Sequence, residues 1–162
     1  VTNDTFKHGF KVRQAISQYV RQIPKELKEN YETLLDDKSY VTIENALYNL
    51  WNTFPEDRAK YLSKTRNIVG FNDKNVRLLW IALNLNTPFY QADNKQGLFE
   101  ELVSYTDERY NADLRMNAFN YLNLMNACND TCKSNLEKAK SHHNWRMVKF
   151  AKDMSEKLEN KQ

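Results

Sequence analysis

Apolar residues dominate residues 72–86, NDKNVRLLWIALNLN. They fill two overlapping ladders at helical spacing, and only Arg77 and Asn84 leave a polar stripe. A helix that is apolar on nearly every side needs packed neighbours on two flanks, and no apolar run in the chain is long enough to span a membrane. The pattern therefore predicts a central buried helix, with Leu79, Trp80 and Leu83 among the most buried residues.

Amphipathic stretches flank this helix on both sides. Apolar stripes at helical spacing cover residues 12–23, 27–35, 43–54, 98–103, 114–125 and 147–158, and a TFPE sequence at 53–56 has the form of a capping box for a short helix ending near Thr65. Ser39 or Thr42, Asn111 and Asn129 are the expected N-caps of three helices, and Pro24 is expected to end the first helix. With only three Gly and three Pro for hairpin turns, the chain is predicted to be all-α with about eight or nine helices.

The long apolar helices resemble one another at a fixed interval. Ala46, Ala82 and Ala118 follow each other at steps of 36 residues, and NAL at 45–47 is nearly repeated by NAF at 117–119. Intervals of this length are typical of helix-pair solenoids, in which each pair buries its apolar face against the next. The interval favours an alpha-alpha superhelix of stacked antiparallel helix pairs, of the HEAT or armadillo kind, over a globular bundle.

Size and charge narrow the class further. The 162 residues form one predicted domain with 12% aromatic residues, typical of an ordered chain. The 24 basic and 21 acidic residues are mixed along every segment, which argues against a phosphate-tracking groove for nucleic acid. The start shows no signal-peptide pattern and Val1 is not an initiator residue, so the chain is expected to be a piece of a longer protein.

The two cysteines, Cys128 and Cys132, are separated by only three residues. Structural zinc needs four ligands, and the sequence offers no second Cys or His pair at suitable spacing. Two buried thiols near a helix junction are the preferred interpretation. The alternative is a local disulfide, which would place the domain outside the cytosol.

Few residues suggest chemistry. Phosphate loops, nucleophile elbows and the His-Glu-x-x-His helix do not occur in the sequence. Adjacent His142 and His143 diverge on a helix and are interpreted as capping and surface groups. The carboxylate pairs at 36–37 and 100–101 are interpreted as solvated. Arg77 and Arg115 stand inside apolar helices, so each is expected to pair with a buried carboxylate or to point into a cavity.

A series of short sequence words resembles a known family. In order, these are YLSKTR at 61–66, VGFNDKNVR at 69–77, RMNAFNYL at 115–122, HHNW at 142–145 and KFA at 149–151. The series, over about residues 39–158, is similar to the C-terminal helical domain of bacterial zinc aminopeptidases of the aminopeptidase N family, the gluzincins. Family members carry their zinc and exopeptidase motifs in an earlier catalytic domain, and neither motif occurs here.

The resemblance implies a non-catalytic domain, without a cofactor of its own, that packs against its own catalytic domain and helps enclose the zinc active site. Peptide substrate would be met only indirectly, and no catalytic or metal residue transfers to this sequence. Residues 1–38 would form the seam with the preceding domain, and Arg77 and Arg115 are the candidate substrate-cavity or interdomain contacts. The alternative is a free-standing helical-repeat scaffold that binds a peptide or protein. A periplasmic or cell-envelope location is slightly favoured over the cytoplasm.

Overall fold

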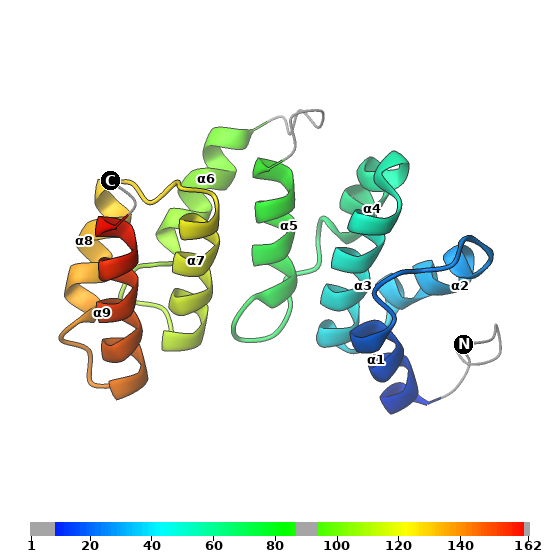
Figure 1. Cartoon of the computed structure of the whole chain (residues 1–162), viewed down its shortest axis with the longest axis horizontal. Coiled ribbons are helices and arrows are strands. Elements are labelled where there is room, and N and C mark those ends of the chain that lie inside the picture. Colours follow the sequence, from blue (N-terminus) through cyan, green and yellow to red (C-terminus); the bar gives the residue numbers. More distant parts are fainter. Residues whose placement is uncertain (1–8, 87–93, 161–162) are drawn as a thin grey trace. The chain divides into compact units, whose positions relative to one another are not determined.

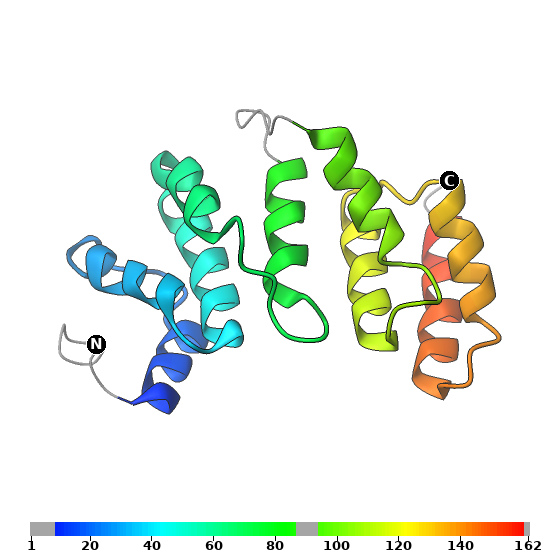
Figure 2. The same ribbon diagram turned by 180° about the vertical axis from the view of Figure 1, so that it is seen from behind.

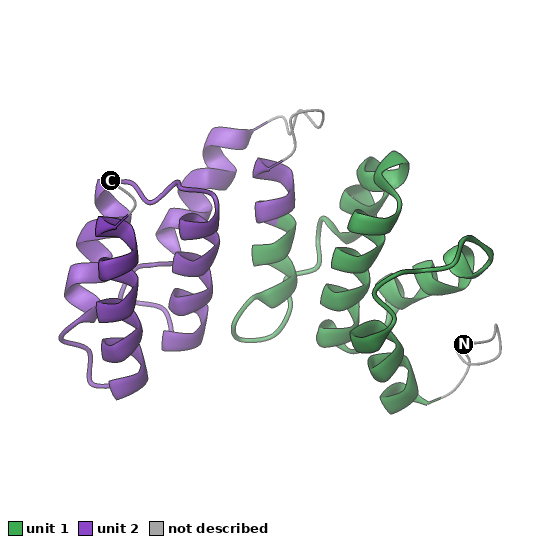
Figure 3. Cartoon of the chain, in the orientation of Figure 1, with its two compact units in different colours: residues 1–80 green, residues 81–162 purple. Residues whose placement is uncertain are grey.

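The computed structural model describes residues 9–86 and 94–160. Every regular element in these ranges is a helix, as Figure 1 shows, and the predicted all-α class is confirmed. The chain divides into two compact units, Val1–Trp80 and Ile81–Gln162 (Figure 3). The single domain and the stacked superhelix expected from the sequence stay predictions.

Unit 1 is built around α3. Its helices are α1 (Phe10–Tyr19), α2 (Lys28–Glu32), α3 (Tyr40–Thr53) and α4 (Arg58–Thr65), with the short 3-10 turns η2 (Lys25–Leu27), η3 (Thr33–Asp36) and η4 (Pro55–Asp57) between them. Helices α1 and α4 both pack against α3, and α2 runs across rather than along it (Figures 1 and 2). The predicted α3 stripe from Ile43 to Phe54 is buried throughout.

Helix α1 is shorter than its apolar stripe predicts. It ends at Tyr19, before Pro24, and the Tyr19 side chain is 81% exposed instead of facing the core. The reason lies in the neighbouring segment, because the Tyr31 hydroxyl donates to the Val20 carbonyl at 3.0 Å. The side chain of Asn49 in α3 also donates to the Ser17 carbonyl at 2.8 Å. These two contacts fix where the helix ends.

The capping box predicted at residues 53–56 does not form. Thr53 is the last residue of α3, and its hydroxyl donates to the Asn49 carbonyl at 2.8 Å instead of capping the next helix. Pro55 begins η4, and α4 follows it and ends at Thr65 as expected. A hydroxyl at a helix C-terminus readily bonds to the carbonyl one turn earlier. Thr53 therefore belongs to the end of α3 and does not cap the following helix, although the motif predicts that it does.

The central helix, α5 (Asn75–Leu85), begins one residue before Val76, the first residue of its apolar pattern. Gly70 has φ of 103° and Lys74 has φ of 50°, so the backbone turns through the left-handed region before the helix starts. Trp80 is 7%, Leu79 4% and Leu83 8% exposed, so all three are buried as predicted. They are not the most buried residues of the helix, because Val76, Leu78 and Ile81 are 0% exposed. The Trp80 indole donates to the Leu62 carbonyl at 2.8 Å.

Unit 2 contains the end of α5 and four further helices. These are α6 (Lys95–Ser104), α7 (Ala112–Leu124), α8 (Asp130–Ala139) and α9 (Trp145–Glu159). Helix α7 contacts α6 and α9, and α8 contacts α9 (Figures 1 and 2). The predicted caps form, because Asn111 accepts from the Leu114 amide at 2.9 Å and Asn129 from the Cys132 amide at 3.0 Å.

The repeat at 36-residue steps falls at equivalent places in α3, α5 and α7. Ala46 and Ala118 are 0% and Ala82 is 4% exposed. A small buried residue in the middle of a helix lets a neighbouring helix approach closely. The repeat therefore marks three similar packing positions, and their stacking into one superhelix remains a prediction.

Candidate functional site

The Arg77 side chain contacts the Trp80 ring and the Arg66 carbonyl, both within unit 1. Its guanidinium lies over the Trp80 ring, 4.7 Å from the ring centroid. One terminal nitrogen reaches the Arg66 carbonyl at 3.4 Å, and the side chain is half-buried. Arg77 thus helps cover Trp80. Its expected contact with a substrate cavity or another domain stays a prediction.

Arg115 is the most deeply buried charged residue in the described ranges, at 1% exposure. Its Nε donates to the Thr106 carbonyl at 3.0 Å, while both terminal nitrogens have no hydrogen-bond partner among the described residues. Burial lowers the pKa of Arg115, and the nearby Asp107 and Glu108 carboxylates act in the opposite direction. The predicted pairing with a buried carboxylate is not present in the described part of the chain, so the charge is balanced at longer range.

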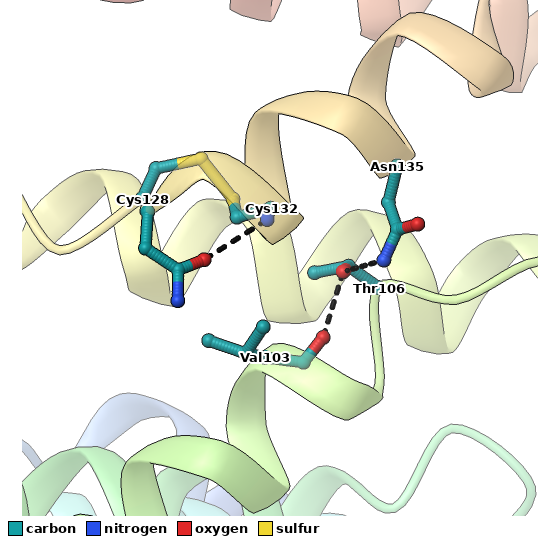
Figure 4. The surroundings of a disulfide bond; sticks show 6 residues. Val103, Thr106, Cys128, Cys132 and Asn135 are labelled. Atoms are coloured by element: carbon teal, nitrogen blue, oxygen red, sulfur yellow. Dashed lines mark hydrogen bonds between the residues drawn. A yellow bond between two sulfur atoms is a disulfide. The ribbon is translucent and has the colours of Figure 1, made fainter.

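Thr106 joins Arg115 to a second buried polar residue. The Thr106 hydroxyl donates to the Val103 carbonyl at 2.7 Å and accepts from Asn135 Nδ2 at 2.9 Å (Figure 4). Thr106 is 0% and Asn135 6% exposed. The backbone carbonyl of Thr106 accepts a hydrogen bond from Arg115 Nε. Through its three partners, Thr106 connects α6, α7 and α8. Sequence reasoning did not identify Thr106 or Asn135, because neither residue type carries a local signal for a buried network.

Cys128 and Cys132 form a disulfide, with Cα atoms 5.3 Å apart (Figure 4). This corrects the preferred interpretation as two thiols. Asn129, the cap of α8, lies between them, and its side chain accepts from the Cys132 amide. The cap draws residue 132 back toward residue 129 and brings the two Cβ atoms within reach of one bond. Spacing alone left both oxidation states open.

The two histidines occupy the turn before α9. Asn144 is the N-cap of that helix, and His142 Nδ1 accepts from the Asn144 amide at 3.0 Å. The rings of His142 and His143 stack with centroids 4.1 Å apart instead of diverging as expected, because both residues precede α9. Burial lowers the pKa of His142, and the charges of His143 and Arg115 lower it further. The interpretation of His142 as a turn-capping group agrees with these contacts.

The paired carboxylates do not share a site. Asp36 contacts Lys64 at 2.6 Å and Asp37 contacts Arg13 at 2.5 Å, so each has its own cation. Glu100 accepts from Gln96 at 2.8 Å and Glu101 from the Tyr105 hydroxyl at 2.6 Å. Asp37 differs from the expected solvated face, because its side chain is only 2% exposed.

A surface groove of about 370 Å³ lies between α6 and the start of α8. We call it the α6–α8 groove. Val103 and Asn135, both buried, line it together with the more exposed Phe99, Glu100 and Asp107. It is the place where the Thr106 network reaches the surface of unit 2, and it combines apolar and acidic groups.

Comparison of the chain with protein-family models, with curated proteins and with solved structures returns no match. Within residues 9–86 and 94–160, no three His, Cys, Asp or Glu side chains gather as a metal site. In the same ranges no helix combines the length and apolar character needed to cross a membrane. The candidate site residues are therefore identified by their geometry alone.

Proposed function

We propose that the chain is a non-catalytic C-terminal helical domain of a zinc aminopeptidase of the aminopeptidase N family. In this proposal it packs against the catalytic domain and helps enclose the active site. Support comes from the ordered sequence words over about residues 39–158, three of which, at 61–66, 115–122 and 149–151, lie mainly on α4, α7 and α9. The zinc and the catalytic groups belong to the other domain.

One structural observation carries the interface part of the proposal. Helix α1, within the seam expected at residues 1–38, exposes 51% of Phe10, 39% of Val12 and 81% of Tyr19. Val12 and Tyr19, seven positions apart, lie on the same side of this helix, whereas Phe10 lies on another side. Exposed apolar side chains on a helix face are typical of a surface that another domain covers. Phe6, Phe89 and Tyr90, also expected at such edges, lie outside the described residues.

The disulfide bears on where the protein works. Disulfides persist in secreted and periplasmic proteins and are rare in the cytosol, where thiols are kept reduced. A disulfide at the start of α8 supports the proposed periplasmic or cell-envelope location. Mass spectrometry of the protein from its native compartment, with and without thiol alkylation, tests this point.

Photo-crosslinking tests the proposed interface directly. The full reading frame upstream of Val1 is first searched for His-Glu-x-x-His followed by a downstream Glu. In the full-length protein, a photoreactive phenylalanine analogue at Tyr19 should then crosslink to the catalytic domain. The same analogue at Tyr48, a 53% exposed residue of α3, provides the comparison. A reading frame without the zinc motif, or equal crosslinking from both positions to unrelated proteins, refutes the proposal and favours the free-standing scaffold.

A further inference from the structure

The Asn135 side chain lines the α6–α8 groove and carries a hydrogen-bond acceptor that no described residue uses. Asn135 donates through Nδ2 to Thr106 at 2.9 Å, whereas its Oδ1 has no hydrogen-bond partner in the part of the chain that the structure describes. Asn135 lines the groove, and its exposed fraction is only 6%. The bond to Thr106 fixes the orientation of the amide (Figure 4). A ligand that enters the groove therefore meets an oriented acceptor, which suits an N–H donor.

The walls of the groove combine an apolar surface with negative charge. Phe99 and Val103 supply the apolar part, and the carboxylates of Glu100 and Asp107 stand at the rim with one cation, Arg109. Arg109 is already engaged, because its Nε lies 3.5 Å from Asp107 and its guanidinium lies 5.3 Å from the centroid of the Tyr110 ring. The groove thus has net negative charge in a chain whose total charge is +3.

We infer that the α6–α8 groove binds the basic side chain, arginine or lysine, of a peptide. The aliphatic stem would lie against Phe99 and Val103, since long basic side chains bury their stems on apolar surfaces and keep the charged end near polar groups. The charged end would donate to Asn135 Oδ1 and to the rim carboxylates. A volume of about 370 Å³ is at the small end of the roughly 300–1,000 Å³ range of ligand pockets, which suits one side chain rather than a folded partner.

Charge complementarity favours a basic side chain in the groove over an acidic or an apolar one. An acidic side chain would face two carboxylates and an amide oxygen, and a purely apolar one would leave Asn135 Oδ1 without a donor on burial, which costs free energy. The inference uses residues of unit 2 alone and does not depend on the proposed peptidase function. It adds a peptide-binding site to the chain itself.

A peptide titration tests the inference on the 162-residue chain. The probes are the blocked tripeptides acetyl-Ala-X-Ala-amide with X as Arg, Lys, norleucine or Glu. Binding is followed by NMR through the backbone amides and the Asn129 and Asn135 side-chain amides. We expect the Arg and Lys peptides to shift groove signals and to bind about tenfold more tightly than the norleucine peptide.

Variants locate the site. Glu100→Gln combined with Asp107→Asn should weaken Arg-peptide binding about tenfold, and Arg109→Gln should tighten it by removing a competing cation. Glu137→Gln on α8 is the matched control, because it removes one exposed carboxylate that does not line the groove, and should leave binding unchanged. Unaltered far-UV circular dichroism confirms that each variant is folded.

Any one of several results would overturn the inference. They are the absence of any peptide binding, equal affinity for the norleucine or Glu peptide, less than a twofold loss in the double variant, or weaker binding by Arg109→Gln than by the unchanged chain. Shifts confined to residues outside the groove would place the site elsewhere, which also contradicts the assignment.

Discussion

The buried contact between Asn49 and Tyr31 should hold α1 against α3. Asn49, 5% exposed, donates to the Ser17 carbonyl at 2.8 Å and to the Tyr31 hydroxyl at 2.9 Å. The Tyr31 hydroxyl in turn donates to Val20. The three bonds connect the end of α1, the α2 segment and α3. Helix α1 also carries the exposed Tyr19 of the proposed interface, so the proposal requires that this helix is anchored.

Replacing Asn49 by Leu removes both donated bonds and leaves the Ser17 carbonyl with only the longer contact from the Tyr31 hydroxyl, at 3.4 Å. A net hydrogen bond contributes about 0.5–1.5 kcal/mol, and a buried group left unpaired costs about 1–3 kcal/mol. Asn49→Leu should therefore lower the free energy of unfolding by about 2–4 kcal/mol. Tyr31→Phe, which removes only the hydroxyl, should cost about 1–2 kcal/mol.

A double-mutant cycle isolates the contact. Because the two residues share one bond, the double variant should be less destabilised than the sum of the single variants by about 0.5–1 kcal/mol. Urea unfolding followed by circular dichroism measures the free energies, and amide hydrogen exchange reports whether α1 opens first. Asn52→Ala is the control, since Asn52 is exposed and bonds only to the Tyr48 carbonyl. Strict additivity, or a cost below about 1 kcal/mol for Asn49→Leu, would refute the reasoning.

Three further predictions concern single features. Opening the Cys128–Cys132 disulfide by reduction should lower the unfolding free energy by roughly 2 kcal/mol, the loop-entropy value for so short a ring, and calorimetry that shows no shift contradicts this. Arg115→Met should change stability by less than about 1 kcal/mol, while Arg115→Ala should cost about 3 kcal/mol, because a buried charge with few partners contributes little beyond its packing; equal losses in urea unfolding would show that the charge itself stabilises the fold. Burial raises the pKa of Glu44 above its usual value, so protonated Glu44 favours the folded state and ionised Glu44 opposes it. The stability that the protonated carboxyl contributes is therefore lost as pH rises through the raised pKa. Glu44→Gln should then be more stable than the unchanged chain at pH 7 and not at pH 4, and a pH-independent difference would contradict the assignment.

The sequence determined the helices and their buried faces. Hydrophobic spacing and side-chain caps act within one or two turns, so the stripe of α3, the caps at Ser39, Asn111 and Asn129 and the burial of Trp80 could all be predicted. The resemblance to a peptidase domain also comes from the sequence alone. These features depend on neighbouring residues, and no distant contact overrides them.

Only the tertiary structure decided the features that join distant segments. The end of α1 depends on a hydroxyl from Tyr31, and Thr53 bonds back to α3 although its own motif assigns it to the next helix. Thr106 and Asn135 form a hydrogen bond although they are 29 positions apart in the chain. Their residue types alone do not predict a buried network. Such polar contacts are set by how helices pack, and packing places Arg115 in the interior and the Asn135 side chain at the groove.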